Sequence, residues 1–374
     1  MSGRTVFGSV RRVVVKIGSS SLAMPGDGLS SERVKGIADV VADATLAGRQ
    51  VVLVTSGAIA AALAPLGLRR PPRDLATQQA AASVGQTALM AVYAASFSQR
   101  GLIVGQVLMT SEDVVRRAHY RNAQRTLYRL MELGVVPVVN ENDTVATDEI
   151  RFGDNDRLAA LVAHLVHADA MILLSDVDGL YDGPPHREGS RLVRSVRTAD
   201  DLNGIEFGKP GQSGIGSGGM RTKVEAARIA TGAGIPVLVA SADDAAAALA
   251  GSGVGTYFHV TGRRVPTRLL WLAHAATAVG ALHLDSGAVS AVVQRRKSLL
   301  PAGIMRVDGR FTAGDPVDIL DENGGIVARG LVNFDSAELP RLLGRSTKDL
   351  AREFGSSYER EIVHRDSLVV LPRA

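Results

Sequence analysis

Short apolar runs and helical segments alternate along residues 10–260, and this alternation limits the fold more than any other feature of the chain. The apolar runs are rich in valine and leucine and lack a regular polar alternation, which is typical of strands buried on both faces of a parallel sheet. The pattern predicts an α/β fold with three layers, in which helices cover both faces of a mainly parallel sheet. The predicted strands are 10–17, 51–55, 101–109, 135–140, 170–175 and 236–240, and the predicted helices are 31–46, 58–65, 75–99, 120–133, 154–167 and 221–233.

The pattern changes after about residue 265. Helical periodicity fades, and short β-like runs at 303–307, 315–320 and 326–331 lie between turns rich in glycine and aspartate. Runs of this kind predict a small, mainly-β domain. We therefore expect three parts: an α/β domain at 1–266, a linker at 267–280 and a mainly-β domain at 281–374.

Composition narrows the class of protein. The chain has no cysteine, which excludes a disulfide scaffold, cysteine-based zinc sites and thiol nucleophiles. A net charge of +4 over 374 residues is too small to predict binding to nucleic acid or to a membrane surface. The first twelve residues lack the apolar core of a signal peptide, and the uncharged stretches 50–68 and 75–99 are interrupted by proline or by many polar residues. We expect a cytoplasmic protein without a membrane partner.

Two predicted strands end in residues suited to anions. Lys16 lies inside an apolar strand, where a charge is costly unless an anion meets it, and Gly18 would let backbone N–H groups approach a phosphate. The alternative is a lysine that faces solvent at a strand edge. The segment Ser56-Gly57-Ala58 joins a strand to a helix and presents free N–H groups to a carboxylate or phosphate, unless it is an ordinary capped turn.

A third group of polar residues follows the predicted strand 135–140. Asparagine and acidic residues cluster in 140–143 and again in 152–156. Asp154 is explained well enough as the N-cap of the next helix. Asp143, Asn155 and Asp156 are suited to binding an ammonium group and to orienting a lysine.

Two further segments suggest a nucleotide. The strand 170–175 ends in Ser175-Asp176, which suits a nucleotide or a simple Asx turn. The glycine-rich segment 214–219 leads into a helix that carries Lys223. Because no strand precedes it, this segment is not a dinucleotide fingerprint, and we expect it to deliver Lys223 to phosphates. His164 and His167 lack an evident third ligand, so we expect no metal site made of protein side chains.

The chain resembles the amino-acid kinase family in the order and spacing of six segments: VVVKIGSSSL, VTSGAIAAAL, VVPVVNENDTVAT, RFGDNDRLAA, LLSDVDGLYDGPP and GIGSGGMRTK. Its last part, with LLPAGIMRVDGRFTAGDPVDIL and GGIVARG, resembles the PUA domain that bacterial members often append. The resemblance covers nearly the whole chain. It departs slightly at Ser175, where the family often has threonine, and the hydroxyl is kept.

The resemblance implies roles for particular residues. The catalytic residues would be Lys16, Asp156 and Lys223, with Asp156 holding two lysines that flank the transferred phosphoryl group. The acceptor would be bound by Ser56, Gly57, Ala58, Asp143 and Asn155. ATP would be bound by Lys16, Gly18, Ser175, Asp176, Ser217, Gly218, Gly219, Met220, Arg221, Thr222 and Lys223. Mg²⁺ would bridge the phosphate oxygens, mostly through water and substrate.

The resemblance also implies an activity, of which NENDTVAT together with GDND is the more specific sign. This activity is the ATP-dependent phosphorylation of the γ-carboxylate of L-glutamate to L-glutamyl 5-phosphate, the first step of proline biosynthesis. The family further implies feedback inhibition by proline and assembly into dimers or tetramers. The product is a reactive acyl phosphate, so hand-over to a glutamyl phosphate reductase is expected.

Two alternatives stay open at this stage. The acceptor could instead be acetylglutamate, aspartate, carbamate or a nucleoside monophosphate, although a carboxylate at Asp143 favours a free ammonium group over an acylated one. The other alternative is RNA binding through the C-terminal domain. Residues 281–374 hold thirteen basic and thirteen acidic residues, whereas an RNA-binding face usually has a basic excess. A regulatory or assembly role for that domain is therefore the stronger expectation.

Overall fold

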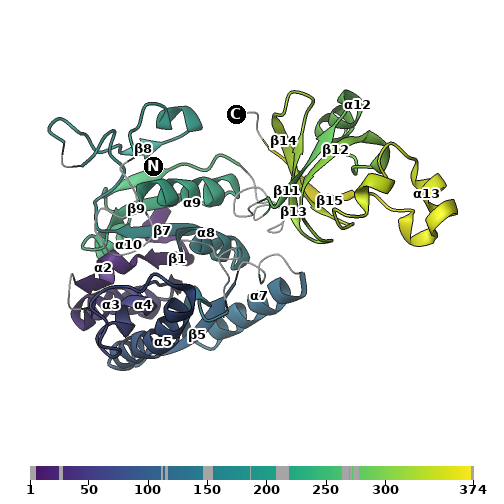
Figure 1. Cartoon of the computed structure of the whole chain (residues 1–374). Coiled ribbons are helices and arrows are strands. Elements are labelled where there is room, and N and C mark those ends of the chain that lie inside the picture. Colours follow the sequence, from purple (N-terminus) through teal and green to yellow (C-terminus); the bar gives the residue numbers. More distant parts are fainter. Residues whose placement is uncertain are drawn as a thin grey trace. The chain divides into compact units, whose positions relative to one another are not determined.

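The computed structural model describes residues 6–24, 28–110, 113, 117–145, 155–185, 187–207, 219–262, 269, 272 and 278–371. The chain divides into two compact units, Met1–Val265 and Pro266–Ala374 (Figure 1).

The N-terminal unit is built on a sheet with the strand order β5-β6-β4-β1-β7-β9-β10-β8. All of its pairings are parallel except that of β10 with β9. The strands are β1 (Arg12–Ile17), β4 (Gln50–Val54), β5 (Ile103–Met109), β6 (Val135–Glu141), β7 (Ala170–Ser175), β8 (Ser195–Val196), β9 (Val237–Ser241) and β10 (Thr256–Phe258), and a separate pair is formed by β2 (Ala23–Met24) and β3 (Gly28–Leu29).

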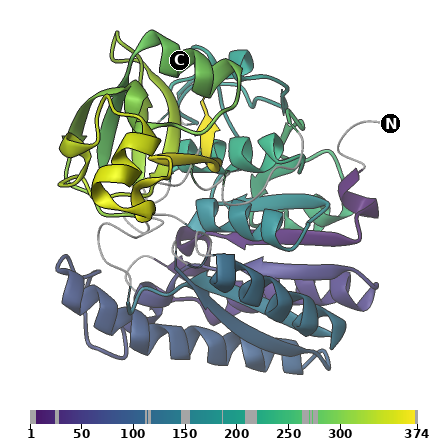
Figure 2. The same cartoon turned by 90° about the vertical axis from the view of Figure 1, so that its right-hand side faces the viewer.

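Helices lie on both faces of this sheet (Figure 2). One face is covered by α7 (Arg117–Glu132), α8 (Asn155–Leu165) and α9 (Met220–Gly232), which contact the sheet through β6, β1 and β9. On the other side lie α3 (Ser31–Leu46), α5 (Leu75–Ser98) and α10 (Ala245–Ala250). The described short elements are α1 (Val6–Ser9), α2 (Ser19–Leu22), α4 (Ala58–Ala62) and η2 (Ala199–Leu202).

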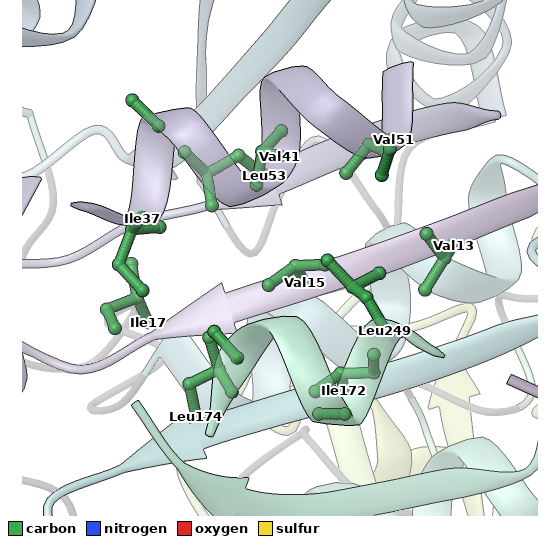
Figure 3. Packing of buried hydrophobic residues seen from close by; sticks show 14 of the residues in the cluster. Val13, Val15, Ile17, Ile37, Val41, Val51, Leu53, Ile172, Leu174 and Leu249 are labelled. Carbon is green, nitrogen blue, oxygen red and sulfur yellow. The ribbon is translucent and has the colours of Figure 1, made fainter. Parts of the chain in front are cut away.

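Strand β1 shows how the sequence sets the two layers. Val13, Val15 and Ile17 point to one side and pack with α3 and α10 in an apolar cluster (Figure 3). Side chains alternate along a strand, so Val14 and Lys16 face the other layer, where α8 packs. A charged residue of the central strand therefore meets the start of α8 and not solvent.

Helix α5 is unusual because its backbone touches that of α4. A Cβ atom built on Gly85 would lie 1.7 Å from the carbonyl oxygen of Ala58, so no larger residue fits at this contact. By length and composition alone, α5 is also apolar enough to span a membrane. In the structure, Leu89, Tyr93 and Phe97 of α5 are fully buried in the core of the unit.

The C-terminal unit contains a second, mostly antiparallel sheet with the order β12-β11-β13-β14-β15. Its strands are β11 (Gly280–Leu284), β12 (Ile304–Gly309), β13 (Pro316–Leu320), β14 (Ile326–Val332) and β15 (Val363–Val370). Its short helices are α12 (Ser286–Val289), η3 (Ser290–Gln294), η4 (Pro301–Gly303), η5 (Leu339–Arg341), α13 (Thr347–Phe354) and η6 (Ser356–Tyr358). Leu282, Val317, Ile319 and Val363 lie in a core of its own, as expected for a separate domain.

The predicted fold class is confirmed: a mostly parallel α/β sheet precedes a mainly-β unit. Two strands of the first sheet, β8 and β10, were not predicted from the sequence. They are two and three residues long, too short to show a period. Helix α8 ends at Leu165, two residues before the predicted end, and His167 has a positive φ of 53°.

Candidate active site

Two lysines and one aspartate from three separate elements meet inside the N-terminal unit. Lys16 Nζ of β1 lies 2.5 Å from Asp156 Oδ1, and Lys223 Nζ of α9 lies 3.1 Å from Asp156 Oδ2. Asp156 is fully buried in the first turn of α8, and the two lysines are 2% and 6% exposed. The alternative interpretation of Lys16 as a solvent-facing residue is therefore wrong.

The charge of this trio determines what it attracts. Two ammonium groups share one carboxylate, so the trio carries one more positive than negative charge at low exposure. Such an excess favours an anion in the adjoining space, because charges interact strongly where water is scarce. Thr222 adds a hydroxyl, whose Oγ1 lies 3.0 Å from Asp156 Oδ2.

The carboxyl of Asp156 stays ionised in this environment. Burial alone opposes its ionisation, but the charges of Lys16 and Lys223 and their hydrogen bonds outweigh burial and hold the pKa of Asp156 well below its usual range. Asp156 is thus an ion-pairing group that orients both lysines, and it is not suited to accept a proton at neutral pH.

A neutral cluster of polar groups adjoins the trio, because Asn155 directly precedes Asp156. Asn155 Nδ2 lies 2.8 Å from the carbonyl oxygen of Thr55, 2.9 Å from Ser56 Oγ and 2.8 Å from Asn140 Oδ1. The carboxyl ends of β4 and β6 and the start of α8 thereby converge on one amide. Ser56 accepts from a side chain across the sheet, and helix α4 has no side-chain cap, so the alternative of a capped turn is wrong for this serine.

Asn155 presents an unused acceptor. Its Nδ2 must face the Thr55 carbonyl, which can only accept, so its Oδ1 points away from that carbonyl. This Oδ1 atom is buried and has no hydrogen-bond partner within the described part of the chain. A buried acceptor without a donor is costly, so a donor group of a ligand fits here.

The strand ends beside β1 bring further predicted residues close to Lys16. A Cβ on Gly18 would lie 3.7 Å from Lys16 Nζ, and a Cβ on Gly57 would lie 4.0 Å from Ser19. Gly57 itself has a φ of 100°, the left-handed region that favours glycine. The turns after β1 and β4 are thus neighbours.

Ser175 is the next residue along β7 after the pair Ile17–Leu174, so it stands level with Gly18. Ser175 is 4% exposed, and its hydroxyl donates to the adjacent Asp176 at 3.1 Å. This short-range bond leaves both earlier interpretations of the segment open. Gly219 is the N-cap of α9, and Met220, Arg221 and Thr222 form its first turn before Lys223.

Ser217 and Gly218 lie outside the described residues, as does the predicted N-cap Asp154. Asp143 lies half-exposed in the turn after β6, and its role toward an ammonium group stays a prediction.

Sequence reasoning assigned no role to Asn140 or to Gln86, which the structure joins by a hydrogen bond of 2.8 Å. Asn140 was noted only as part of a polar cluster. Gln86 gave a weak signal, a polar residue in an alanine-rich helix. His164, for which the sequence offers no third metal ligand, is buried within α8. Among the described residues, no three histidine or acidic side chains gather as a metal site.

Comparison with known proteins identifies both parts of the chain. The model of the amino acid kinase family matches residues 11–241, and that of the PUA domain matches residues 280–354. A glutamate 5-kinase of Streptomyces coelicolor is 64% identical over 368 residues, which cover 98% of each chain. Glutamate 5-kinases of Salinispora arenicola and Rhodococcus jostii are 63% and 54% identical over 97% and 98% of this chain, and over 98% and 99% of their own.

Proposed function

The chain belongs to the amino acid kinase family, and on that premise we propose that it transfers the γ-phosphoryl group of ATP to the γ-carboxylate of L-glutamate. The product would be L-glutamyl 5-phosphate, and the reaction would be the first step of proline biosynthesis. The observation that carries the proposal is the buried Lys16–Asp156–Lys223 trio, next to the polar cluster at Asn155. The glutamate 5-kinases that match nearly the whole chain support the same acceptor.

The acceptor needs no general base. A glutamate side chain has an ordinary pKa of about 4.3, so it is ionised at neutral pH and can attack directly. One carboxylate oxygen forms a bond to the γ-phosphorus while the bond from that phosphorus to the bridging oxygen of ADP breaks. Because two anions must approach each other, the main requirement is neutralisation of charge.

The trio would meet that requirement. Lys16 and Lys223 approach Asp156 from different elements, and in the proposal their ammonium groups flank the phosphoryl oxygens. Asp156 would hold both lysines in place through charge-assisted hydrogen bonds. Preorganised charges of this kind stabilise a transition state without reorganisation during the reaction.

On the acceptor side, Ser56, Gly57, Ala58, Asp143 and Asn155 would bind glutamate. The unused acceptor of Asn155 and the carboxylate of Asp143 both suit the α-ammonium group. An acetylated nitrogen would leave the carboxylate of Asp143 without its charged partner, which favours free glutamate over acetylglutamate.

ATP would lie on the other side of the trio, against Gly18, Ser175, Asp176 and the segment 217–223. When Mg²⁺ is bound it would neutralise charge on the phosphates. Both oxygens of Asp156 already face lysines, and the described residues hold no acidic cage. The residues present therefore fit a metal held mainly by phosphate and water.

We propose a cytoplasmic homo-oligomer, inhibited by proline and handing its acyl phosphate to a reductase. Proline shares the α-carboxylate and amino nitrogen of glutamate, so competition at the acceptor site is expected. Inhibition that does not depend on glutamate concentration would contradict that site.

The test is turnover by the purified protein of MgATP with glutamate, acetylglutamate, aspartate or a nucleoside monophosphate in parallel. Hydroxylamine traps an acyl phosphate as a hydroxamate, and ADP release reports total transfer. Hydroxamate with glutamate alone is the expected result. Turnover of another acceptor would leave the proposed role of the two lysines intact but overturn the roles of Asp143 and Asn155. Absence of turnover with all four acceptors would favour the alternative function, RNA binding by the C-terminal unit.

A further inference from the structure

Gln86 is a buried polar residue on helix α5 that has no role in the proposed reaction. It is 8% exposed, and its side chain lies between two other amides. Its Oε1 accepts from Asn140 Nδ2 at 2.8 Å, and its Nε2 donates to Gln106 Oε1 of β5 at 3.2 Å. Gln86 thus joins the helical layer to the end of β6.

Backbone groups determine which way these amides face. The N–H of Glu141 donates to Asn140 Oδ1 at 2.9 Å, so oxygen must occupy that position. Asn140 Nδ2 then faces Gln86, which must present an acceptor. The same Asn140 Oδ1 accepts from Asn155 Nδ2 at 2.8 Å. Each amide therefore has one allowed orientation, and the series ends at the unused acceptor of Asn155.

The reach of Gln86 depends on its neighbour in the sequence. Because Gly85 lacks a side chain, α5 contacts α4 directly at Ala58. The next residue, Gln86, can then reach Asn140 inside the sheet layer. Two adjacent residues of one helix thus provide the close approach and the acceptor.

We propose that Gln86 is a positioning residue for the acceptor substrate, acting through Asn140 on Asn155. This inference rests on the proposed function. Without the Gln86 acceptor, Asn140 Nδ2 is a buried donor with no partner, so the Asn140 side chain would move toward another acceptor. Its Oδ1 would then draw away from Asn155 Nδ2. Asn155, held by Thr55 and Ser56 alone, would present its Oδ1 to the substrate less firmly.

The kinetic test compares three variants. Gln86→Met keeps the length of the side chain but removes the acceptor. We expect it to raise KM for glutamate about tenfold, as for the loss of one buried hydrogen bond, and to change KM for ATP less than twofold. Gln86→Glu keeps an accepting oxygen in either protonation state, so it should restore KM to within about twofold of the native value.

Ser96→Ala is the matched control, because Ser96 is buried on the same helix and its hydroxyl donates within α5, to the carbonyl oxygen of Val92 at 2.8 Å. It should leave both KM values unchanged. Equal rises in both KM values for Gln86→Met, or no rescue by Gln86→Glu, would overturn the positioning role.

A second measurement does not depend on turnover. The chain has seven asparagines, so selective ¹⁵N labelling gives a small set of side-chain amide signals. In Gln86→Met, the signals of Asn140 and Asn155 should shift and their protons exchange faster, while those of Asn323 and Asn333 in the other unit stay constant. Unchanged Asn155 signals would show that Gln86 does not act on Asn155 through Asn140, even if turnover fell.

The two proposals can fail separately. If the native protein phosphorylates a different acceptor, the proposed function fails, and the same KM comparison is made with the acceptor that it uses. If glutamate is the acceptor but Gln86→Met behaves as the native protein does, only the positioning role fails.

Discussion

Asn155 and Asp156 are consecutive residues at the start of α8, yet they belong to two regions that work differently. Asp156 anchors a charged trio, in which the strength of the interaction depends on net charge and low exposure. Asn155 anchors a neutral cluster, in which each bond depends on which atom faces which. A change of charge in the trio should therefore lower the free energy of unfolding and kcat strongly. A change of amide orientation in the neutral cluster should instead raise KM for the acceptor.

The largest effect is expected for Asp156→Asn. The variant keeps the shape but leaves two buried ammonium groups without their carboxylate, which should lower the free energy of unfolding by about 3–5 kcal/mol at pH 7. Denaturant unfolding measures it, with Asn155→Asp as a comparison that adds a negative charge at the neighbouring position. A loss below about 1 kcal/mol would show that the trio is far more hydrated than its burial indicates.

The same variant has a pH signature. The folded-state pKa of Asp156 lies below its unfolded value, so its stabilisation is fully present above the unfolded value and is lost as the pH falls toward the folded one. The difference in free energy of unfolding between the native protein and Asp156→Asn should stay constant from pH 7 to about 5 and become smaller at lower pH. A gap that widened on acidification would contradict the direction of the shift.

Lys223→Ala should preserve the fold, because Lys16 and Asp156 remain as a neutral pair. It removes one of the two charges proposed to meet the phosphoryl oxygens, so kcat should fall on the order of 10²-fold or more. Steady-state kinetics and a melting curve together separate catalysis from folding. A kcat within fivefold of the native value would show that Lys223 does not take part in phosphoryl transfer.

Asp143→Ala tests the residues proposed to bind the acceptor. It should raise KM for glutamate by about tenfold, since one charge-assisted bond to the ammonium group is lost, with kcat and KM for ATP changed little. Asp113→Ala serves as a control, because its carboxylate bonds locally to Thr110 and His119. An unchanged KM for glutamate would make the ammonium role of Asp143 wrong.

The smallest effect is expected for Thr222→Val, which removes only the hydroxyl near Asp156. Both lysines still pair with the carboxylate, and the hydroxyl shares its single proton between Asp156 and the carbonyl oxygen of Gly219. We therefore expect kcat to fall by only about two- to fivefold, the lower end for the loss of one hydrogen bond. A loss as large as that of Lys223→Ala would mean that the hydroxyl contacts the reacting groups directly.

The sequence predicts those parts of the structure that depend on local or periodic patterns of residues. The apolar runs predicted the long strands of the parallel sheet, and the segments between them predicted the long helices α3 and α5. The resemblance to the amino-acid kinase family also singled out Lys16, Asp156 and Lys223, which the structure brings together.

The rest depends on relations that no local pattern carries. The strand β10 is short and antiparallel, and its pairing with β9 is set by tertiary contacts. The bond between Gln86 and Asn140 joins residues far apart in the sequence, and its direction follows from a backbone N–H at Glu141. Sequence periodicity tells which face a residue occupies, but not which acceptor its amide will meet.

The origin of the trio in three distant segments affects how the protein is made. Lys16 emerges from the ribosome early and belongs to the central strand, Asp156 follows only with α8, and Lys223 follows with α9. Until α8 has been synthesised, docking β1 in its native surroundings would bury an ammonium group without its counter-ion. The first part of the chain therefore gains little from folding early, and the sheet should form as a unit once the chain through β10 has left the exit tunnel. A truncated chain ending before α8 would then be a substrate for chaperones and proteases and not a smaller stable domain.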